Sequence, residues 1–205
     1  AIDIGATYQK SDTNNVDIVY ISSNHATHTQ YAIYFLEQGC DVFIEKPIAI
    51  NKRQLDLLSH AVKKANKKVY VGYNRPHSPS IKIIKDSFID NKTPFTLSCF
   101  VSGHFIPKDH WYRDPSEGTR IVSNLGHWID LSIYILSWSK TFPEFLDVII
   151  SYSDLQMPSD NIGVSIVSSN HDLINITFTS RGEPFEGVRE MINFQKDDIT
   201  VQIDD

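Results

Sequence analysis

The 205-residue sequence has few of the features that mark secreted or membrane proteins. It contains only two cysteines, without CxxC spacing, so we expect Cys40 and Cys99 to be small core residues in a reducing compartment rather than a disulfide or a metal pair. No apolar run approaches the ~20 residues needed to cross a bilayer, and no charged-then-apolar leader opens the chain. These absences predict a cytoplasmic protein without a membrane partner.

A large positive charge is also missing. Nineteen basic and twenty-five acidic side chains give a net charge of −6, and no basic stripe could follow a phosphate backbone. Nucleic acid is therefore not an expected partner. Apolar residues at 41% and charged residues at 21% are ordinary for a globular chain of one or two domains.

The first third of the chain alternates short apolar runs with amphipathic segments. We expect strands over residues 16–22, 41–45 and 69–73, and helices over 29–38 and about 51–66. Gly39 stands where left-handed helix caps favour glycine, and Asn51 with Gln54 resembles a capping box. Strands and helices that alternate at this spacing imply parallel pairing with right-handed crossovers. The pattern predicts part of a doubly wound α/β layer.

The pattern changes after residue 73. Ser78 is a candidate N-cap and Pro79 a first helical residue, for a helix ending near residue 90. Six runs with period-two alternation follow, over residues 95–105, 148–152, 162–168, 173–179, 188–194 and 199–203. They predict an open, mainly antiparallel sheet with one face covered by a helix over residues 124–138. We therefore expect two domains, residues 1–73 and 74–205, and an α/β part followed by an α+β part.

Lys46 ends the apolar run Val42-Phe43-Ile44-Glu45-Lys46-Pro47. Such a run delivers the lysine to the carboxyl edge of a sheet, where open α/β sheets bind their ligands. Pro47 disfavours helical geometry at Lys46 and so restricts the direction of the amine. A lysine at a strand end can equally be a solvated surface charge.

A polar group lies on one side of the expected long helix. At about 100° per residue, Ser123, Asn124, His127 and Asp130 fall within roughly 120°, beside an apolar stripe of Leu125, Ile129, Ile133 and Leu136. The polar side either faces water or lines a cleft. In a cleft opposite Lys46, His127 would complete a pair of titratable groups suited to moving a proton.

The loop over residues 110–120 gathers aromatic and charged residues in a connection that contains Gly and Pro. The faces of Trp111 and the charge of Arg113 suit a polyhydroxylated ligand, which presents apolar C–H faces and hydroxyl edges. Loops of this composition also cap sheets without binding a ligand.

These motifs, in their order along the chain, resemble the Gfo/Idh/MocA oxidoreductases, most closely a branch associated with bacterial sugar and polysaccharide metabolism. The resemblance rests on residues 21–28, the Glu45-Lys46-Pro47 element, residues 71–75 and the segment 118–131. It implies a partial Rossmann-type domain that binds NAD or NADP, and a second domain that binds a sugar or nucleotide sugar and forms homo-oligomers, dimers or tetramers.

The resemblance also implies roles for individual residues. Lys46 and His127 match the family's catalytic lysine and histidine, and Asp130 an aspartate that supports them. Cofactor contacts are implied for Ser22, Asn24, His25, Glu45, Lys46 and Pro47, a proline that is often cis. The expected substrate-binding residues, including those of the loop, are Asn74, Arg75, Trp111, Arg113, Asn124 and Asp130.

The sequence departs from the family pattern at two places. No GxGxxG turn occurs, so we expect the pyrophosphate-binding unit to precede Ala1 and the family's last strands to follow the C-terminus. Several relatives carry an acid three or four residues before the histidine, whereas this chain has Asn124 and Ser123.

Three mechanistic questions stay open at this level. Lys46 could be the base, or it could stabilise an oxyanion while His127 acts as the base. The chain could instead be a non-catalytic sensor that binds a dinucleotide or a sugar. A metal-dependent hydrolase using His25, His28 or His110 is a weaker alternative, because no carboxylate or thiolate ligands stand nearby, and we expect no metal.

Overall fold

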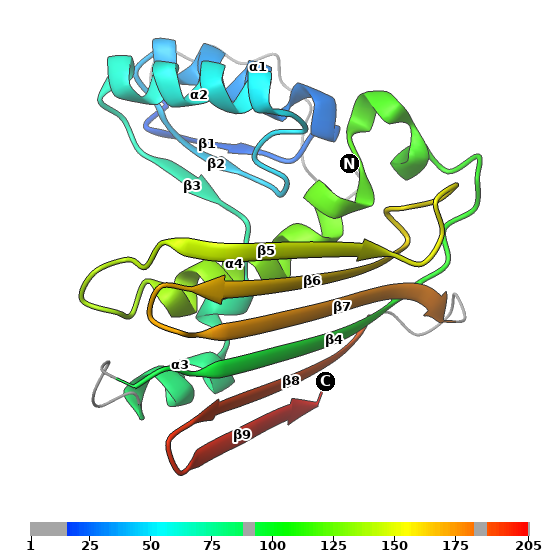
Figure 1. Cartoon of the computed structure of the whole chain (residues 1–205). Helices are drawn as coiled ribbons and strands as arrows, with labels where there is room; N and C mark the ends of the chain where they lie inside the picture. The colour runs from blue at the N-terminus through cyan, green and yellow to red at the C-terminus, as the bar shows by residue number, and fades with distance from the viewer. Residues whose placement is uncertain (1–15, 88–92, 183–187, 205) are drawn as a thin grey trace.

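Two separate β-sheets organise the computed structural model, which describes residues 16–87, 93–182 and 188–204 (Figure 1). The N-terminal sheet has three strands and the second has six. Helices α1 and α2 lie over the first sheet, whereas α3 and α4 lie behind the second in the view of Figure 1.

The N-terminal sheet is entirely parallel, in the order β1-β2-β3. Its strands are β1 (Ile18–Ile21), β2 (Asp41–Ile44) and β3 (Val69–Val71). Helices α1 (His25–Glu37) and α2 (Lys52–Ala65) alternate with them and cover one face. The buried core of this layer comprises Ile21, Ala32, Leu36, Val42, Ile44, Leu58 and Ala61. The predicted Rossmann-type parallel layer is confirmed.

Local signals set most helix ends in this layer. Gly39 follows α1 with φ +82°, and Asn66 ends α2 in the left-handed region at φ 50°. The side chain of Asn51 accepts a hydrogen bond from the backbone N of Gln54, as a cap should. The Gln54 side chain, however, accepts from the backbone N of Ile50, so only half of the capping box forms.

The six-stranded sheet has the order β5-β6-β7-β4-β8-β9. Its strands are β4 (Thr96–His104), β5 (Phe145–Tyr152), β6 (Asn161–Ser168), β7 (Leu173–Gly182), β8 (Arg189–Lys196) and β9 (Ile199–Asp204). All neighbours pair antiparallel except β4 and β7, which are parallel. The predicted mainly antiparallel sheet is confirmed, with one parallel pair at its centre.

Short helices precede and follow β4. A 3₁₀ turn, η1 (Arg75–His77), leads into α3 (Pro79–Asp86), whose cap is Ser78 as predicted. After β4 come the 3₁₀ turns η2 (Trp111–Arg113) and η3 (Pro115–Glu117), then the π-helix η4 (Ile121–Leu125) and α4 (Gly126–Leu136).

Helix α4 covers the sheet as predicted. Of the expected apolar stripe, Leu125 and Leu136 lie in the core and Ile129 packs against it. Leu125, Trp128, Leu131 and Ile135 join the core against β4, β6 and β7, whereas Ile133 is 42% exposed. The expected stripe assumed a regular helix from residue 124, and the π-helical turn η4 breaks that regular advance of 100° per residue. Ser123 and His127, from the expected polar side of the helix, are both buried.

Both cysteines are buried and free, as expected of core residues. Among the described residues no helix is both long and apolar enough to cross a membrane. The division into two domains after residue 73 stays a prediction, which the change from one sheet to the other supports.

Candidate functional site

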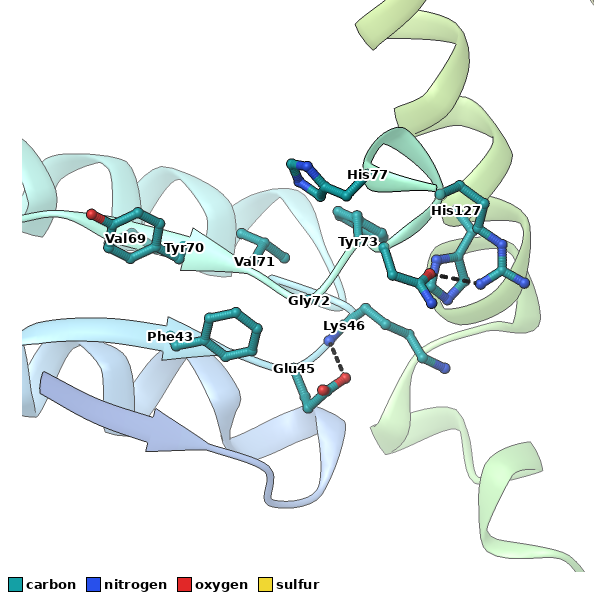
Figure 2. Close-up of a pocket in the computed structure, with 12 residues that line it drawn as sticks. Phe43, Glu45, Lys46, Val69, Tyr70, Val71, Gly72, Tyr73, His77 and His127 are labelled. Atoms are coloured by element: carbon teal, nitrogen blue, oxygen red, sulfur yellow. Dashed lines mark hydrogen bonds between the residues drawn. The ribbon is translucent and has the colours of Figure 1, made fainter. Parts of the chain in front are cut away.

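A pocket of about 690 Å³ opens where the carboxyl ends of β2 and β3 meet the start of α4 (Figure 2). Both of the predicted catalytic side chains, Lys46 and His127, line it. Figure 2 shows the Lys46 side chain running from its strand end toward the helix that carries His127. The remaining lining residues are Phe43, Glu45, Val69, Tyr70, Val71, Gly72, Tyr73, Asn74, Arg75 and His77.

Lys46 follows β2 directly, and its peptide bond to Pro47 is cis. The ammonium Nζ donates a hydrogen bond to the hydroxyl of Tyr112, 3.3 Å away. The Glu45 carboxylate instead accepts from the backbone N of Lys46, at 3.3 Å. It lies against Gly72, where a Cβ would come within 3.0 Å of Oε2. Glycine at position 72 therefore makes room for the carboxylate.

His127 is a buried histidine at the start of α4 and is only 8% exposed. Burial, followed by the positive charges of Arg75 and Lys46, lowers the pKa of His127 to about 3. Its Nδ1 has no hydrogen-bond partner among the described residues, and its ring meets the Tyr73 ring edge-on at 5.5 Å. The imidazole is therefore neutral near pH 7.

Arg75 is fixed in place by contacts on several sides. Its Nη1 donates to the Asn74 side chain at 2.8 Å, and Nε and Nη2 donate to the Glu190 carboxylate on β8. The guanidinium also lies over the Trp128 ring, 4.8 Å from its centroid. Asn74 and Arg75 thus belong to the pocket as predicted, with much of the donor capacity of Arg75 already used.

Two further titratable side chains, Asp130 and Tyr73, have shifted pKa values in this region. Burial raises the pKa of Asp130, while the positive charge of His77 opposes that rise. Burial and the negative charge of Asp130 raise the pKa of Tyr73. Asp130 lies near the pocket without lining it. Asn124, also predicted to bind the substrate, accepts a hydrogen bond from the Ser123 hydroxyl at 3.1 Å.

The aromatic loop docks beside the pocket rather than inside it. Arg113 makes a two-bond ion pair with the buried Asp160 and also donates to the Ile106 carbonyl at 2.6 Å. Trp111 is 48% exposed and packs edge-on against His25 at 5.1 Å. The structure therefore places neither Trp111 nor Arg113 in the lining of this pocket.

The predicted cofactor residues of the first loop contact Glu117. Its carboxylate accepts from the Asn24 side chain at 3.2 Å and from the backbone N of Ala26 at 3.0 Å. Nδ1 of His25 lies 3.2 Å from the Glu117 carbonyl oxygen. Burial, the largest cause, lowers the pKa of His25. These contacts join the start of α1 to η3.

Ser22 and Pro47 lie away from the lining of the main pocket. Ser22 lines a separate pocket of about 420 Å³ beside β1 and α1. The carbonyl of Pro47 is 2.8 Å from Nδ1 of His28, whose Nε2 is 2.9 Å from the Ser23 carbonyl. Of the predicted residues, the pocket thus unites Glu45, Lys46, Asn74, Arg75 and His127.

Sequence reasoning missed several residues around the pocket. Tyr73 directly precedes Asn74, and Tyr112 stands between Trp111 and Arg113, so their positions beside predicted residues were the available signal. Glu117 and Glu190 form hydrogen bonds with residues more than 90 positions away in the sequence, Ala26 and Arg75 respectively. No local sequence pattern could have identified them.

The histidines proposed as metal ligands are held by protein groups. His28 contacts two carbonyls, and Nδ1 of His110 accepts from the backbone N of Tyr112 at 3.2 Å. Within the described ranges no group of three or more His, Cys, Asp or Glu side chains could hold a metal ion.

Comparison with known proteins finds a family match for the first layer. Residues 6–73 match the Gfo/Idh/MocA family model, described as an oxidoreductase family with an NAD-binding Rossmann fold. The matched segment includes the parallel sheet and the Lys46 element, in agreement with the resemblance of its motifs.

Relatives of known name match the same region. Oxidoreductase P35 of Formosa agariphila is 34% identical over 76 residues, 37% of this chain and 24% of the relative. Myo-inositol 2-dehydrogenase of Thermotoga maritima is 32% identical over 79 residues, 38% of this chain and 23% of the relative. These matches span about a quarter of each relative.

Solved structures match nearly the whole chain. A probable dehydrogenase from Thermotoga maritima superposes with a TM-score of 0.75 at 22% identity, covering 93% of this chain and 57% of the other. The WlbA dehydrogenase from Bordetella pertussis, solved with NADH and UDP-GlcNAcA, gives 0.75 at 16%, covering 93% and 56%. At these identities the likeness establishes the fold, and the chain spans a little over half of each structure.

Proposed function

We propose that the protein is an NAD(P)-dependent oxidoreductase that transfers a hydride to or from a hydroxyl- or ketone-bearing carbon of a sugar, nucleotide sugar or cyclitol. The observation that carries this proposal is that Lys46 and His127 line one open pocket, although Lys46 follows β2 of the first sheet and His127 lies on α4, which covers the second. The family match and the names of the relatives support the reaction class.

The residues at this edge suit the nicotinamide end of the cofactor. The pocket opens at the carboxyl ends of parallel strands, where doubly wound sheets receive dinucleotides. Asn24, His25, Glu45 and Lys46 would hold that end, and the bound cofactor would supply or accept the hydride. The 205 residues contain no GxGxxG turn for the pyrophosphate, so the fit concerns this end alone.

The lowered pKa of His127 indicates which of the two proposed catalytic groups, His127 or Lys46, transfers the proton. A neutral imidazole can accept a hydrogen bond from a substrate hydroxyl and so orient it. With a pKa of about 3, however, His127 is too weak a base to accept the proton that this hydroxyl loses. We therefore assign the proton transfer to Lys46, which Tyr112 holds at the pocket. As an ammonium it donates a proton to the alkoxide that forms during reduction, and it can accept the hydroxyl proton during oxidation only after it has lost a proton to solvent.

Arg75 and Asn74 would bind the rest of the substrate. The contacts with Glu190 and Trp128 fix the guanidinium, so little side-chain entropy is lost when a ligand binds. Hydroxyl groups are suitable partners for the donors that Arg75 has left and for the amide of Asn74.

One observation favours a second candidate, a non-catalytic sensor of a dinucleotide or sugar. The positions where several relatives carry an acid before the histidine hold Ser123 and Asn124, which hydrogen-bond to each other. Neither side chain can take up a proton, so a relay through this helix is missing. A sensor would bind the same ligands without turnover.

The test combines binding with turnover. NADH and NADPH binding is followed by fluorescence, and a panel of nucleotide sugars, free sugars and inositols is scanned at the absorbance of the reduced cofactor. We expect Lys46→Ala to lower turnover by about 10²–10⁴-fold, a much larger change than any loss of cofactor affinity. Lys52→Ala, which changes an exposed lysine on α2, is the matched control. Binding without turnover in the unmodified protein would support the sensor instead.

A further inference from the structure

The charge of Arg75 is neutralised by a residue outside the main pocket. Glu190 lies on β8 of the second sheet, and its carboxylate accepts hydrogen bonds from both Nε and Nη2 of Arg75. The two side chains are only 20% and 13% exposed, so salt and solvent screen the pair weakly. Arg75 therefore lines the pocket as one half of an ion pair rather than as an unpaired cation.

The other charges of the pocket also balance. The carboxylate, ammonium and guanidinium groups among its described lining residues belong to Glu45, Lys46 and Arg75. The Glu45 carboxylate accepts a hydrogen bond from the backbone N of Lys46, so it lies beside the residue that carries the ammonium (Figure 2). With Arg75 paired to Glu190, these groups leave no excess of positive charge to attract an anion.

The donors that remain on Arg75 suit hydroxyl groups. A guanidinium has five N–H bonds, of which the Glu190 carboxylate accepts two and the Asn74 side chain accepts one. One N–H thus remains on each of Nη1 and Nη2. Each can donate to a hydroxyl oxygen, whereas the carboxylate of a ligand at this point would be repelled by the carboxylate of Glu190.

A neighbouring pocket of about 440 Å³ extends this pattern. It shares Asn74 and Arg75 with the main pocket, and its described lining also contains the carboxylates of Glu190 and Asp204. Two carboxylates therefore stand against one guanidinium in this lining. A diphosphate that extended past Arg75 would meet negative charge, which disfavours a nucleotide sugar on this side of the site.

We propose that the substrate of the main pocket is an uncharged polyhydroxylated ring, a neutral sugar or a cyclitol, an inference that rests on the proposed function because it concerns the substrate of the same site. Glu190 sets this preference by neutralising Arg75. Because Glu190 lies outside the lining of the main pocket, it acts on the substrate through the guanidinium and is a positioning residue.

Two sugars with the same ring test the preference in the unmodified chain. D-glucose and D-glucuronate differ at the exocyclic carbon, which carries a hydroxyl in the first and a carboxylate in the second. Bound D-glucose is observed by saturation-transfer NMR at low ionic strength, and D-glucuronate or UDP-glucose is added as a competitor. We expect each competitor to have an inhibition constant at least about tenfold above the dissociation constant of glucose. A competitor that displaces glucose at equal concentration, or an absence of glucose binding, would overturn the proposal.

Glu190→Gln tests the role of the carboxylate. It removes the negative charge but keeps the size of the side chain and one acceptor oxygen for Arg75. We expect the affinity for glucuronate, relative to glucose, to rise at least about tenfold. Glu144→Gln makes the same change at an exposed residue just before β5 and should leave this ratio unchanged.

A double variant shows whether the gain depends on Arg75. Arg75→Gln combined with Glu190→Gln lacks the guanidinium, so the gain for glucuronate should disappear. Circular dichroism checks that each variant is folded, and the competition in the unmodified chain decides the substrate class even if Glu190→Gln is unstable. A folded Glu190→Gln variant with an unchanged ratio would overturn the role of Glu190.

Turnover measurements distinguish a failure of this preference from a failure of the proposed function. The absorbance of the reduced cofactor is followed with glucose, myo-inositol and glucuronate. Turnover of glucuronate as fast as that of the neutral rings would contradict the charge preference and support the proposed function. Preferential binding of glucose without turnover of any ring would support the charge preference and contradict the proposed function.

Discussion

The ammonium of Lys46 lies 3.3 Å from the hydroxyl of Tyr112, although the two residues are 66 positions apart. The lysine leaves a parallel strand, and the tyrosine belongs to a 3₁₀ turn of the aromatic loop. The Tyr112 ring meets the His25 ring edge-on at 5.1 Å, which links the loop to the start of α1. Three separate segments of the chain therefore meet beside the pocket.

This contact predicts graded losses of turnover. Lys46→Ala removes the group that moves the proton, and we expect turnover to fall by about 10²–10⁴-fold. Tyr112→Phe removes one hydrogen bond to the amine, and a loss of roughly tenfold should follow. Tyr134→Phe is a matched control, because its hydroxyl accepts from Lys85 at 3.2 Å away from the pocket. Equal activity of Tyr112→Phe and Tyr134→Phe would show that the Tyr112 contact has no part in the reaction.

The buried ion pairs of Asp160 predict a large effect on stability. Its carboxylate accepts from Arg113 at 2.8 Å and from Arg120 at 3.4 Å, and all three side chains are nearly buried. Asp160→Asn leaves buried positive charge without its counter-ion, so the free energy of unfolding should fall by about 3–5 kcal/mol in urea titrations. Asp56→Asn breaks the exposed pair with Lys52 and should cost less than about 1 kcal/mol. Similar losses for both variants would contradict the structural role of Asp160.

The lowered pKa of His127 predicts acid sensitivity. Above pH 6.5 the imidazole is neutral in both the folded and the unfolded chain, and its full contribution to stability is present. As pH falls from 6.5 toward about 3, the unfolded chain binds a proton that the folded chain does not. His127 should then reduce the free energy of unfolding by about 1.4 kcal/mol per pH unit.

Urea titrations at several pH values test this slope. In the His127→Gln variant the free energy of unfolding should fall less steeply with falling pH than in the unmodified chain. Some pH dependence should persist, because the pKa of His25 is also lowered. Identical slopes for the two proteins would mean that His127 titrates normally in the fold.

The thiols predict a simple chemical result. Burial, with a contribution from the negative charge of Glu190, raises the pKa of Cys99 to about 12, and both cysteines are almost inaccessible. A thiol-specific reagent should therefore modify neither cysteine quickly in the native chain and both after unfolding in urea. Rapid modification of the native protein would contradict the packing around Cys99.

Much of this fold could be predicted from sequence because its signals are local. The cap at Ser78 with Pro79, the glycine after α1 and the alternation along β6 and β7 each act within a few residues. These signals need no knowledge of distant segments, so the elements that they predict match the structure closely.

The misses arise from contacts between distant segments. Helix α1 begins at His25 rather than at residue 29, and its first turn is bound by Glu117 from η3. Arg113 was predicted to bind the substrate. In the structure it forms an ion pair with Asp160, which is 47 positions away in the sequence. A helical projection also could not anticipate the π turn of η4, which places Ser123 inside the protein.

The order of strands in the second sheet has a consequence for how the chain folds. Strand β4 is made first, yet both of its neighbours, β7 and β8, come more than sixty residues later. During synthesis β4 therefore has no neighbouring strand to pair with until the intervening segments are made. Its apolar side chains include Leu97, Cys99 and Val101. Pairing over such distances is slow. The nascent chain can therefore aggregate through β4 until first β7 and then β8 have been made and have paired with its two edges.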